Sequence, residues 1–331
     1  MDINLIGLIR AAVLNGTPLL FGTSGEILTE KSGNLNLGVE GLMFMGGAFG
    51  LCGAFVYGQA AGDHAVGAVA VAIALLASFA AGVIGSLIFS FLTITLRANQ
   101  NVTGLALTIF GTGVGQFVGE LMRLKVGGNV TVSNALKDAF ANPVLPKFLQ
   151  DIPVVGPILF SYNFFVYLGF AAAIIMAYVM AKTRCGLSLC AVGESPATAD
   201  AAGINVTKYK YLATCIGGAM TGLGGLYLVM NAASGVGGAW VYNCIDGYGW
   251  LAVALVIFAV WSPKRALWCS LIFGGLACMR YYYPISFIPA SIYDIVPYIV
   301  TAIVLVAVSL KHSRANQPPE SLGLSYFREE R

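Results

Sequence analysis

The stretch GEILTEKSGNLNLGVEG, residues 25–41, stands between two apolar segments and poses the main question about this chain. It concentrates three glutamates, one lysine and two asparagines in a protein whose charged residues are only 10% of the total. Such a concentration of polar groups marks either a functional site or a loop. The rest of the sequence is needed to distinguish these two interpretations.

The composition is that of an integral membrane protein. Hydrophobic residues make up 58% of the 331 residues, and many of the 41 glycines lie inside apolar runs. Soluble domains carry about 25% charged residues, and small residues let apolar helices approach closely in lipid. A membrane β-barrel would show short alternating segments instead of long apolar runs. The sequence therefore predicts an all-α polytopic membrane protein.

Nine segments are long and apolar enough to cross the hydrocarbon core, which takes about 20 residues. They are 5–24, 36–57, 66–96, 102–121, 162–182, 208–231, 246–262, 266–283 and 294–311. The run 66–96 is long enough to be tilted or broken, and residues 25–40 are candidates for re-entering the membrane. We therefore expect 8–10 transmembrane helices within a membrane domain of residues 1–311, followed by a cytoplasmic tail at 312–331.

Lys and Arg gather in loops that we expect to face the cytoplasm. These are the 182–210 connection, the turn at Lys264 and Arg265, and the tail after residue 310, with Arg97 on the same side by parity. The external segment is then 122–160, although it also carries basic residues. It contains a predicted amphipathic helix, SNALKDAFAN, and a proline-broken loop. A cover over a pore and a plain structural lid are both compatible with it.

Several functions find no support in the residues. The small net charge of +3 argues against nucleic-acid binding. Seven cysteines without CxxC spacing and two isolated histidines indicate neither a disulfide framework nor a metal site. GEILTEKS superficially resembles a phosphate-binding loop, but Glu30 stands where that motif needs its second glycine. We expect no catalytic residue, no metal and no bound cofactor on this chain.

A short helix with both ends marked lies in the segment 183–207. Ser195 is a good N-cap, Pro196 suits the first helical position, and Gly203 suits the position after the last turn. The helix would have about two turns, roughly 10 Å in length, which is too short to be stable alone. Docking into a partner's groove and an ordinary interfacial connector are equally compatible with these residues.

Three motifs together resemble one protein family. AVGESPATADAAGINV (191–206) resembles the cytoplasmic coupling segment of ABC-importer permeases of the branched-chain amino acid, ribose and nucleoside superfamily. The 25–41 stretch resembles that family's N-terminal motif, and PPESLGLSYFREER (318–331) is similar to tails of its simple-sugar and nucleoside branch. The likeness extends over essentially the whole chain. It is closest to the second of two paired permeases in nucleoside uptake systems.

The resemblance implies a type II, vitamin B12-importer-like permease of the bacterial inner membrane. The positions that match the coupling motif, and so imply contact with an ATPase, are Gly193, Glu194, Ser195, Pro196, Ala199, Ala202, Gly203 and Ile204. Relatives often carry Asn or His in place of Ser195, and Ser also caps a helix. The implied partners are a cytoplasmic ABC ATPase that binds ATP and Mg²⁺, a second homologous permease, an outer-face substrate-binding lipoprotein and membrane lipid.

Polar side chains within the apolar spans are candidates for a substrate path, because such groups are costly in lipid and usually face a cavity or the bundle interior. They are Asn15, Thr17, Asn36, Glu40, Gln116 and Trp240. Structural contacts between helices explain any one of them equally well. Asn36 and Glu40 share a face if their segment is helical, whereas Asn34, Asn36 and Glu40 alternate if it is extended.

The aromatic residues Trp240, Tyr242, Tyr248 and Trp250 fit an interfacial belt better than a stacking surface for a base or a sugar. The lack of a charged cluster in the spans favours a neutral polar solute. The leading hypothesis is an alternating-access importer permease for a nucleoside, and a ribose-type sugar permease is the alternative. An ion-coupled secondary transporter with Glu40 or Glu120 in the midplane, and a passive channel, are weaker hypotheses.

On this hypothesis the 25–41 stretch shapes the translocation region. Glu26, Glu30 and Lys31 are predicted to lie at a break between two spans, while Asn36 and Glu40 enter the bundle.

Overall fold

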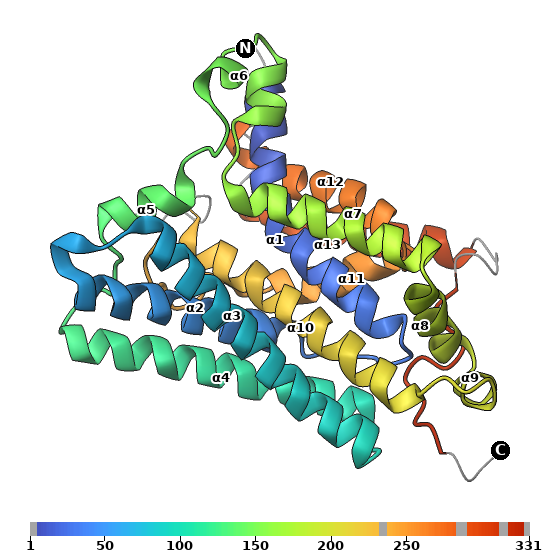
Figure 1. The fold of residues 1–331 in the computed structure, drawn as a ribbon. Coiled ribbons are helices and arrows are strands. Elements are labelled where there is room, and N and C mark those ends of the chain that lie inside the picture. The colour runs from blue at the N-terminus through green and yellow to red at the C-terminus, as the bar shows by residue number, and fades with distance from the viewer. Residues whose placement is uncertain (1–4, 232–236, 283–289, 311–316, 328–331) are drawn as a thin grey trace.

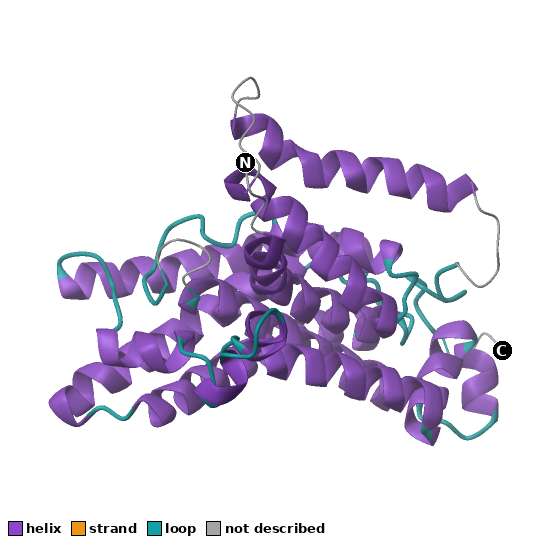
Figure 2. Cartoon of the chain, turned by 90° about the horizontal axis from the view of Figure 1, so that it is seen from above, coloured by secondary structure: helices purple, strands orange, loops and turns teal. Residues whose placement is uncertain are grey.

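The computed structural model describes residues 5–231, 237–282, 290–310 and 317–327, and this part of the chain is helical apart from turns and one isolated β-bridge between Thr131 and Ala239 (Figures 1 and 2). The long helices are α1 (Leu5–Glu30), α2 (Val39–Ala61), α3 (Gly67–Ser90), α4 (Gln100–Val126), α7 (Phe164–Lys182), α10 (Val206–Met230), α12 (Pro263–Tyr282) and α13 (Ala290–Leu310). The shorter elements are η1 (Gly62–His64), η2 (Phe91–Thr95), α5 (Asn134–Ala141), α6 (Lys147–Gln150), η3 (Gly156–Phe160), α8 (Arg184–Glu194), α9 (Pro196–Ala201) and α11 (Tyr248–Phe258). The all-α class is confirmed.

Each of the nine predicted segments is occupied by one helix. Six of them are long and apolar enough to cross a membrane within the described residues, namely α1, α2, α3, α4, α7 and α10. The last three segments hold α11, α12 and α13, of which α11 has only 11 residues. The chain is therefore a polytopic membrane protein, and the number of 8–10 crossings stays a prediction.

The first two spans differ from their predicted bounds. α1 continues to Glu30, so the predicted break at Glu26 and Glu30 is wrong, and only Lys31 lies in the turn that follows. The helix runs on because both carboxylates are buried and hydrogen-bonded inside the bundle. α2 begins only at Val39, so the segment before it is not helical and Asn36 does not share a helix face with Glu40. The long run 66–96 is α3 followed directly by the π-helical turn η2.

The centre of the bundle depends on close backbone contacts at glycines. α10 packs against α1, α2 and α3. At these crossings Gly217 faces Gly25, Gly222 faces Gly46, and Gly218 faces Gly82, each so closely that a methyl group at Gly25, Gly46 or Gly82 would overlap backbone atoms of α10. Small residues permit this approach between membrane helices, so the glycines in the apolar runs build the central packing.

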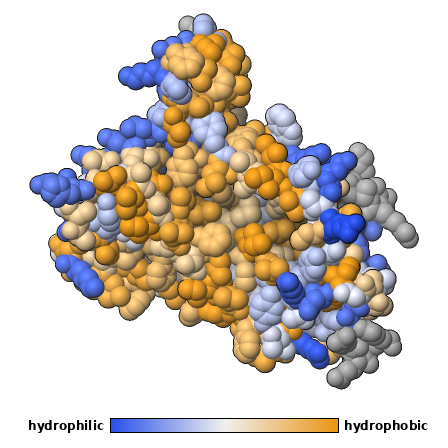
Figure 3. All heavy atoms as spheres, viewed as in Figure 1, coloured by the Kyte–Doolittle hydropathy of each residue, from blue (hydrophilic) through white to orange (hydrophobic). Residues whose placement is uncertain are grey.

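The two ends of the molecule are polar and distinct. Figure 3 shows hydrophobic residues across the middle of one face and hydrophilic residues toward its ends. We define the coupling end by the segments 31–35, 97–100, 193–206 and 317–327, which hydrogen-bond to one another there. The opposite end, which we call the outer end after the orientation predicted from the sequence, carries α5, α6 and η3, and Arg10 near the start of α1 donates to the carbonyl oxygen of Ser161 at 3.4 Å. α1 thus begins at the outer end and finishes at the coupling end.

The 122–160 segment forms the predicted short helix and proline-broken loop. α5 begins after Ser133, whose side chain makes no capping hydrogen bond, so the start of the helix is right and the predicted cap is not used. Leu136 and Phe140 are buried, and α5 packs against α3. The helix therefore closes the outer end of the bundle.

The α2–α10 crossing yields a test of the packing. Gly46→Ala would place a methyl group against the backbone of Gly222, whereas Gly113, on α4, has open space around its Cβ position. We expect Gly46→Ala to lower the stability of the purified protein by about 1–3 kcal/mol, measured by thermal unfolding in detergent. Gly113→Ala is the control and should leave stability unchanged or slightly improved; equal effects of the two substitutions would contradict this packing.

Candidate functional site

Glu40 caps the short helix α11. One carboxylate oxygen accepts the backbone N–H of Gly247 at 2.7 Å, and the other accepts those of Gly249 at 2.6 Å and Trp250 at 3.3 Å. The first N–H groups of a helix have no partner within the helix and favour negative charge. Glu40 stands in the first turn of α2, so one carboxylate fixes the start of α11 against the start of α2. This explains why a carboxylate is tolerated there although it is only 5% exposed.

Glu30 holds the other end of α11. Trp261, in the turn between α11 and α12, donates its indole N–H to the carboxylate of Glu30 at the end of α1. Val260 and Trp261 have φ values of +52° and +50°, which is uncommon for any residue but glycine and a strained conformation for a β-branched one. The hydrogen bond to Glu30 and the burial of Trp261 keep this turn in place. α11 is thereby fixed at both ends by carboxylates of the 25–41 stretch.

Glu26 holds the irregular segment that leads into α2. Its carboxylate accepts the backbone N–H of Asn36 at 3.1 Å, and the side-chain oxygen of Asn36 accepts the N–H of Gly38 at 2.9 Å. Leu35 donates its N–H to Gln100 at 2.7 Å, and Asn34 donates its side-chain N–H to Thr214 at 2.9 Å. Buried backbone outside a helix needs such partners from the surrounding protein. We call Glu26, Glu30 and Glu40 together with residues 31–38 the carboxylate hub.

The coupling segment contains the short helix that the sequence predicts. α9 begins at Pro196, Ser195 accepts the N–H of Thr198 at 3.4 Å, and Gly203 has a φ of +83° after the last turn. Ala199 is buried against Val192 and Val206. The small residues on the other side of α9 and just after it are exposed, namely Ala197, Ala201, Ala202 and Gly203. The exposed group forms a smooth surface at the coupling end.

The coupling segment contacts the carboxylate hub directly. Gly193, at the end of α8, lies so close to Lys31 that a Cβ atom would overlap the Lys31 carbonyl oxygen. The carbonyl oxygen of Gly193 accepts the N–H of Ser321 at 3.1 Å, and the carbonyl oxygen of Gly33 accepts the N–H of Gly323 at 3.2 Å. The tail residues 317–327 thus tie α8 to the loop between α1 and α2.

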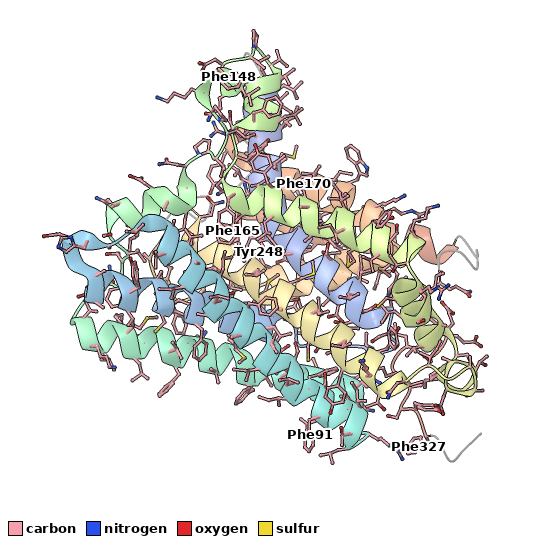
Figure 4. The ribbon with its side chains drawn as sticks, viewed as in Figure 1. Phe91, Phe148, Phe165, Phe170, Tyr248 and Phe327 are labelled. Carbon is pink, nitrogen blue, oxygen red and sulfur yellow. The ribbon has the colours of Figure 1, made fainter. Side chains whose placement is uncertain are left out.

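The tail also reaches the other segments of the coupling end. Glu320 donates its N–H to Glu194 at 3.4 Å, and Tyr326 donates its hydroxyl to Asp200 at 2.9 Å. Figure 4 shows Phe327 at the same end as α9 and Phe148 at the opposite side of the view. The guanidinium of Arg97, between η2 and α4, lies 4.5 Å from the centroid of the Phe327 ring.

The substrate-path candidates do not meet in one place. The side chains of Asn15 and Thr17 hydrogen-bond to backbone carbonyls of their own helix, at 2.9 and 2.8 Å. Asn36 and Glu40 belong to the carboxylate hub, and Gln116 accepts the hydroxyl of Tyr242 at 3.3 Å on α4. Each of these side chains therefore has a hydrogen-bond partner within the protein. Their contact with a solute stays a prediction.

Trp240 and the aromatic residues after it occupy different environments. Trp240 is 9% exposed, packs onto Gly119 and pairs its backbone N–H with Val130 at the outer end. Tyr242 is exposed, while Tyr248 lies near the centre of the molecule (Figure 4) and Trp250 is 42% exposed. These residues therefore do not gather into a single stacking surface in this chain, and the interfacial belt stays a prediction.

Sequence reasoning missed three parts of the site. The backbone N–H groups of Gly247, Gly249 and Trp250 carry no side-chain signal, and Trp261 counted only as part of the predicted span 246–262. Lys210 counted as one of the loop cations, yet it is only 3% exposed. For the backbone donors at the start of α11, the available hint was that glycines lie just before an unusually short apolar run.

The fold and this site together indicate the class of membrane protein to which the chain belongs. The chain is an all-helical polytopic membrane subunit with a short capped helix at one end and a discontinuous helix inside. The model of the family described as "Branched-chain amino acid transport system / permease component" matches residues 8–305, and the chain belongs to this family. It is therefore a multi-pass permease of the inner membrane.

Similar proteins extend over most or all of this sequence. The guanosine ABC transporter permease protein of Bacillus subtilis is 32% identical over 98% of this chain and 97% of its own length. The nucleoside ABC transporter permease protein of Lactococcus lactis is 30% identical over 98% of this chain and 99% of its own. The putative glucose ABC transporter permease protein of Haloferax volcanii is 35% identical over 83% of this chain and 77% of its own.

A solved structure also matches this chain at low sequence identity. It is described as an inward-facing conformation of a putative metal-chelate type ABC transporter. It has a TM-score of 0.46 and 13% identity, covering 92% of this chain and 85% of that one.

The helix cap on α11 yields a second test. Glu40→Ala removes the acceptor of three backbone N–H groups, and leaving buried donors unsatisfied costs about 1–3 kcal/mol. We expect the unfolding free energy to fall by about this amount, and the amides of residues 247–250 to exchange hydrogen faster.

Glu120→Ala is the control for this test. Glu120 is half-exposed and pairs only with Arg123 on the same helix, at 2.8 Å, so its removal should change stability by less than about 1 kcal/mol. Unchanged amide exchange at 247–250 in Glu40→Ala would show that Glu40 does not hold α11.

Proposed function

We propose that this chain is the transmembrane permease subunit of an ATP-driven importer and that its solute is a nucleoside. The observation that carries the proposal is α9, because an exposed, small-residue helix held at both ends is a docking element without catalytic groups of its own. In this proposal a cytoplasmic ABC ATPase binds and hydrolyses ATP with Mg²⁺, and this chain binds no cofactor. A second homologous permease and a substrate-binding lipoprotein on the outer face complete the assembly in the lipid membrane.

The contacts of α9 suggest how closure of the ATPase reaches the membrane interior. α9 follows α8, whose last turn packs on Lys31, and Lys31 follows Glu30, which holds the end of α11. A displacement of α9 would therefore act on the start of α2 and on both ends of α11. Alternating access of a type II permease pair would then follow from the joint movement of α2 and α11.

The nucleoside assignment rests on full-length similarity. The two relatives named for guanosine and nucleoside transport align with 98% of this chain. A simple sugar is the second candidate, because the Haloferax volcanii relative at 35% identity is named for glucose transport.

An ion-coupled secondary transporter is less well supported by the site. That mechanism needs a carboxylate in the membrane that is free to bind and release an ion. Both oxygens of Glu40 accept backbone N–H groups of α11, and Glu120 is half-exposed and paired with Arg123. Neither carboxylate offers an open ion site among the described residues.

Reconstituted transport separates the two solute classes. The assembled importer in liposomes should take up radiolabelled guanosine only with ATP, and unlabelled nucleosides should compete while glucose and ribose should not. Uptake of a sugar without competition by nucleosides would favour the sugar importer, and guanosine uptake driven by an ion gradient without ATP would contradict the importer altogether.

The two sides of α9 yield a test of docking. Ala202→Arg places a long cation on the exposed surface of the coupling segment and should weaken association with the ATPase by about tenfold or more, measured by co-purification and by ATP-dependent uptake. Ala199→Arg, in the buried cluster with Val192 and Val206, should instead destabilise the permease itself. Normal ATPase association of Ala202→Arg would refute the docking role.

A further inference from the structure

A cavity of about 810 Å³ lies at the coupling end, between the end of the coupling segment, the start of α10, the end of η2 and the tail. Its walls include Asn34, Arg97, Asp200, Lys208, Lys210 and Tyr326. A cavity of this size is in the range of small-molecule sites, about 300–1,000 Å³. None of the substrate-path candidates lines it, so it is separate from the predicted path.

Lys210 is the unusual group in this cavity. The residue is only 3% exposed, and among the described residues its ammonium has no hydrogen-bond or ion-pair partner. Lysine is almost never fully buried without a partner, and an unpaired buried charge is costly. The side-chain oxygen of Asn34, on the same wall, is also buried without a hydrogen-bond partner. A ligand that accepts a hydrogen bond from Lys210 and donates one to Asn34 would satisfy both groups.

The surroundings of Lys210 add positive potential. Arg97 and Lys208 line the same cavity, and the first turn of the 25-residue helix α10 points its N-terminal end into it through Val206 and Thr207. Helix N-termini favour anions. Arg97 is held in place by the Phe327 ring, 4.5 Å from its guanidinium carbon.

One carboxylate on the wall opposes this charge only in part. Asp200 accepts the hydroxyl of Tyr326 at 2.9 Å and forms no ion pair with Lys210 in the described chain. The lining therefore has three cationic side chains against one anionic one. A phosphate group suits this arrangement, because it brings at least one negative charge and several acceptor oxygens. The donor for Asn34 would be the hydroxyl of a monoprotonated free phosphate, or a headgroup hydroxyl where the phosphate is a lipid diester.

We propose that this cavity binds a phosphate-bearing anion, with Lys210 and Arg97 as its cationic contacts. Two sources offer this chemistry. The wall at Ile94 and Leu212 belongs to helices that enter the membrane, and Leu212 is 49% exposed, so a phospholipid headgroup can reach the cavity from the bilayer. Gly203 and Asn205 also line the cavity and are exposed, so a soluble phosphate compound can reach it as well. In either case the bound anion would tie the end of the coupling segment to η2.

The test uses the full-length chain in phosphatidylcholine nanodiscs, with or without phosphatidylglycerol and with or without inorganic phosphate. Thermal unfolding and native mass spectrometry report stabilisation and bound lipid. We expect one of the two anions to raise the melting temperature of the natural protein. A response to phosphatidylglycerol alone assigns the lipid source, and a response to inorganic phosphate in neutral lipid assigns the soluble source.

Three substitutions test whether the anion binds in this cavity. Lys210→Met keeps the volume of the side chain and removes the unpaired charge, so it should be at least as stable in phosphatidylcholine and bind the anion about tenfold more weakly. Arg97 is exposed on the wall of the cavity, and Arg97→Gln should independently weaken binding of the anion. Lys182 is an exposed lysine at the end of α7, and Lys182→Met is the matched control. The proposal fails if neither anion stabilises the natural protein, or if Lys210→Met and Arg97→Gln respond as the control does.

Discussion

The carboxylate of Glu40, which accepts three backbone N–H groups at the start of α11, is the interaction on which the interior of this permease depends. A charged group within a membrane bundle is costly unless it is hydrogen-bonded. Here it satisfies donors that the short helix cannot satisfy itself, and Glu30 holds the opposite end through Trp261. An 11-residue helix can therefore lie inside the bundle without spanning it.

The same stretch joins the membrane interior to the coupling end. Lys31 packs on Gly193, and the tail hydrogen-bonds both to Gly193 and to Gly33. The contacts from α9 through α8 to Glu30 and α11 are contiguous, and each consists of backbone or buried side chains. The polar residues of the 25–41 stretch thus have a structural purpose that does not require contact with a solute.

Much of this architecture was predictable from the sequence. Apolar runs located nine helices, and the sequence around Ser195, Pro196 and Gly203 placed α9 because its caps depend on local chemistry. The continuation of α1 to Glu30 could not be predicted, because the carboxylate of Glu30 is stabilised by an indole 231 residues away in the chain. The burial of Lys210 was equally hidden, since its cavity is built from four separate stretches of the chain. Long-range polar contacts leave no periodic pattern.

A double-mutant cycle on Glu30 and Trp261 tests the carboxylate hub most directly. Glu30→Leu, which removes the acceptor, Trp261→Phe, which removes the donor, and the combined variant would be compared by their free energies of unfolding in detergent. If the carboxylate of Glu30 holds the α11–α12 turn, the two effects are non-additive, with a coupling energy of about 1 kcal/mol or more. Effects that add to within about 0.5 kcal/mol would show that the two residues act independently, which would contradict the role of the 25–41 stretch in fixing α11.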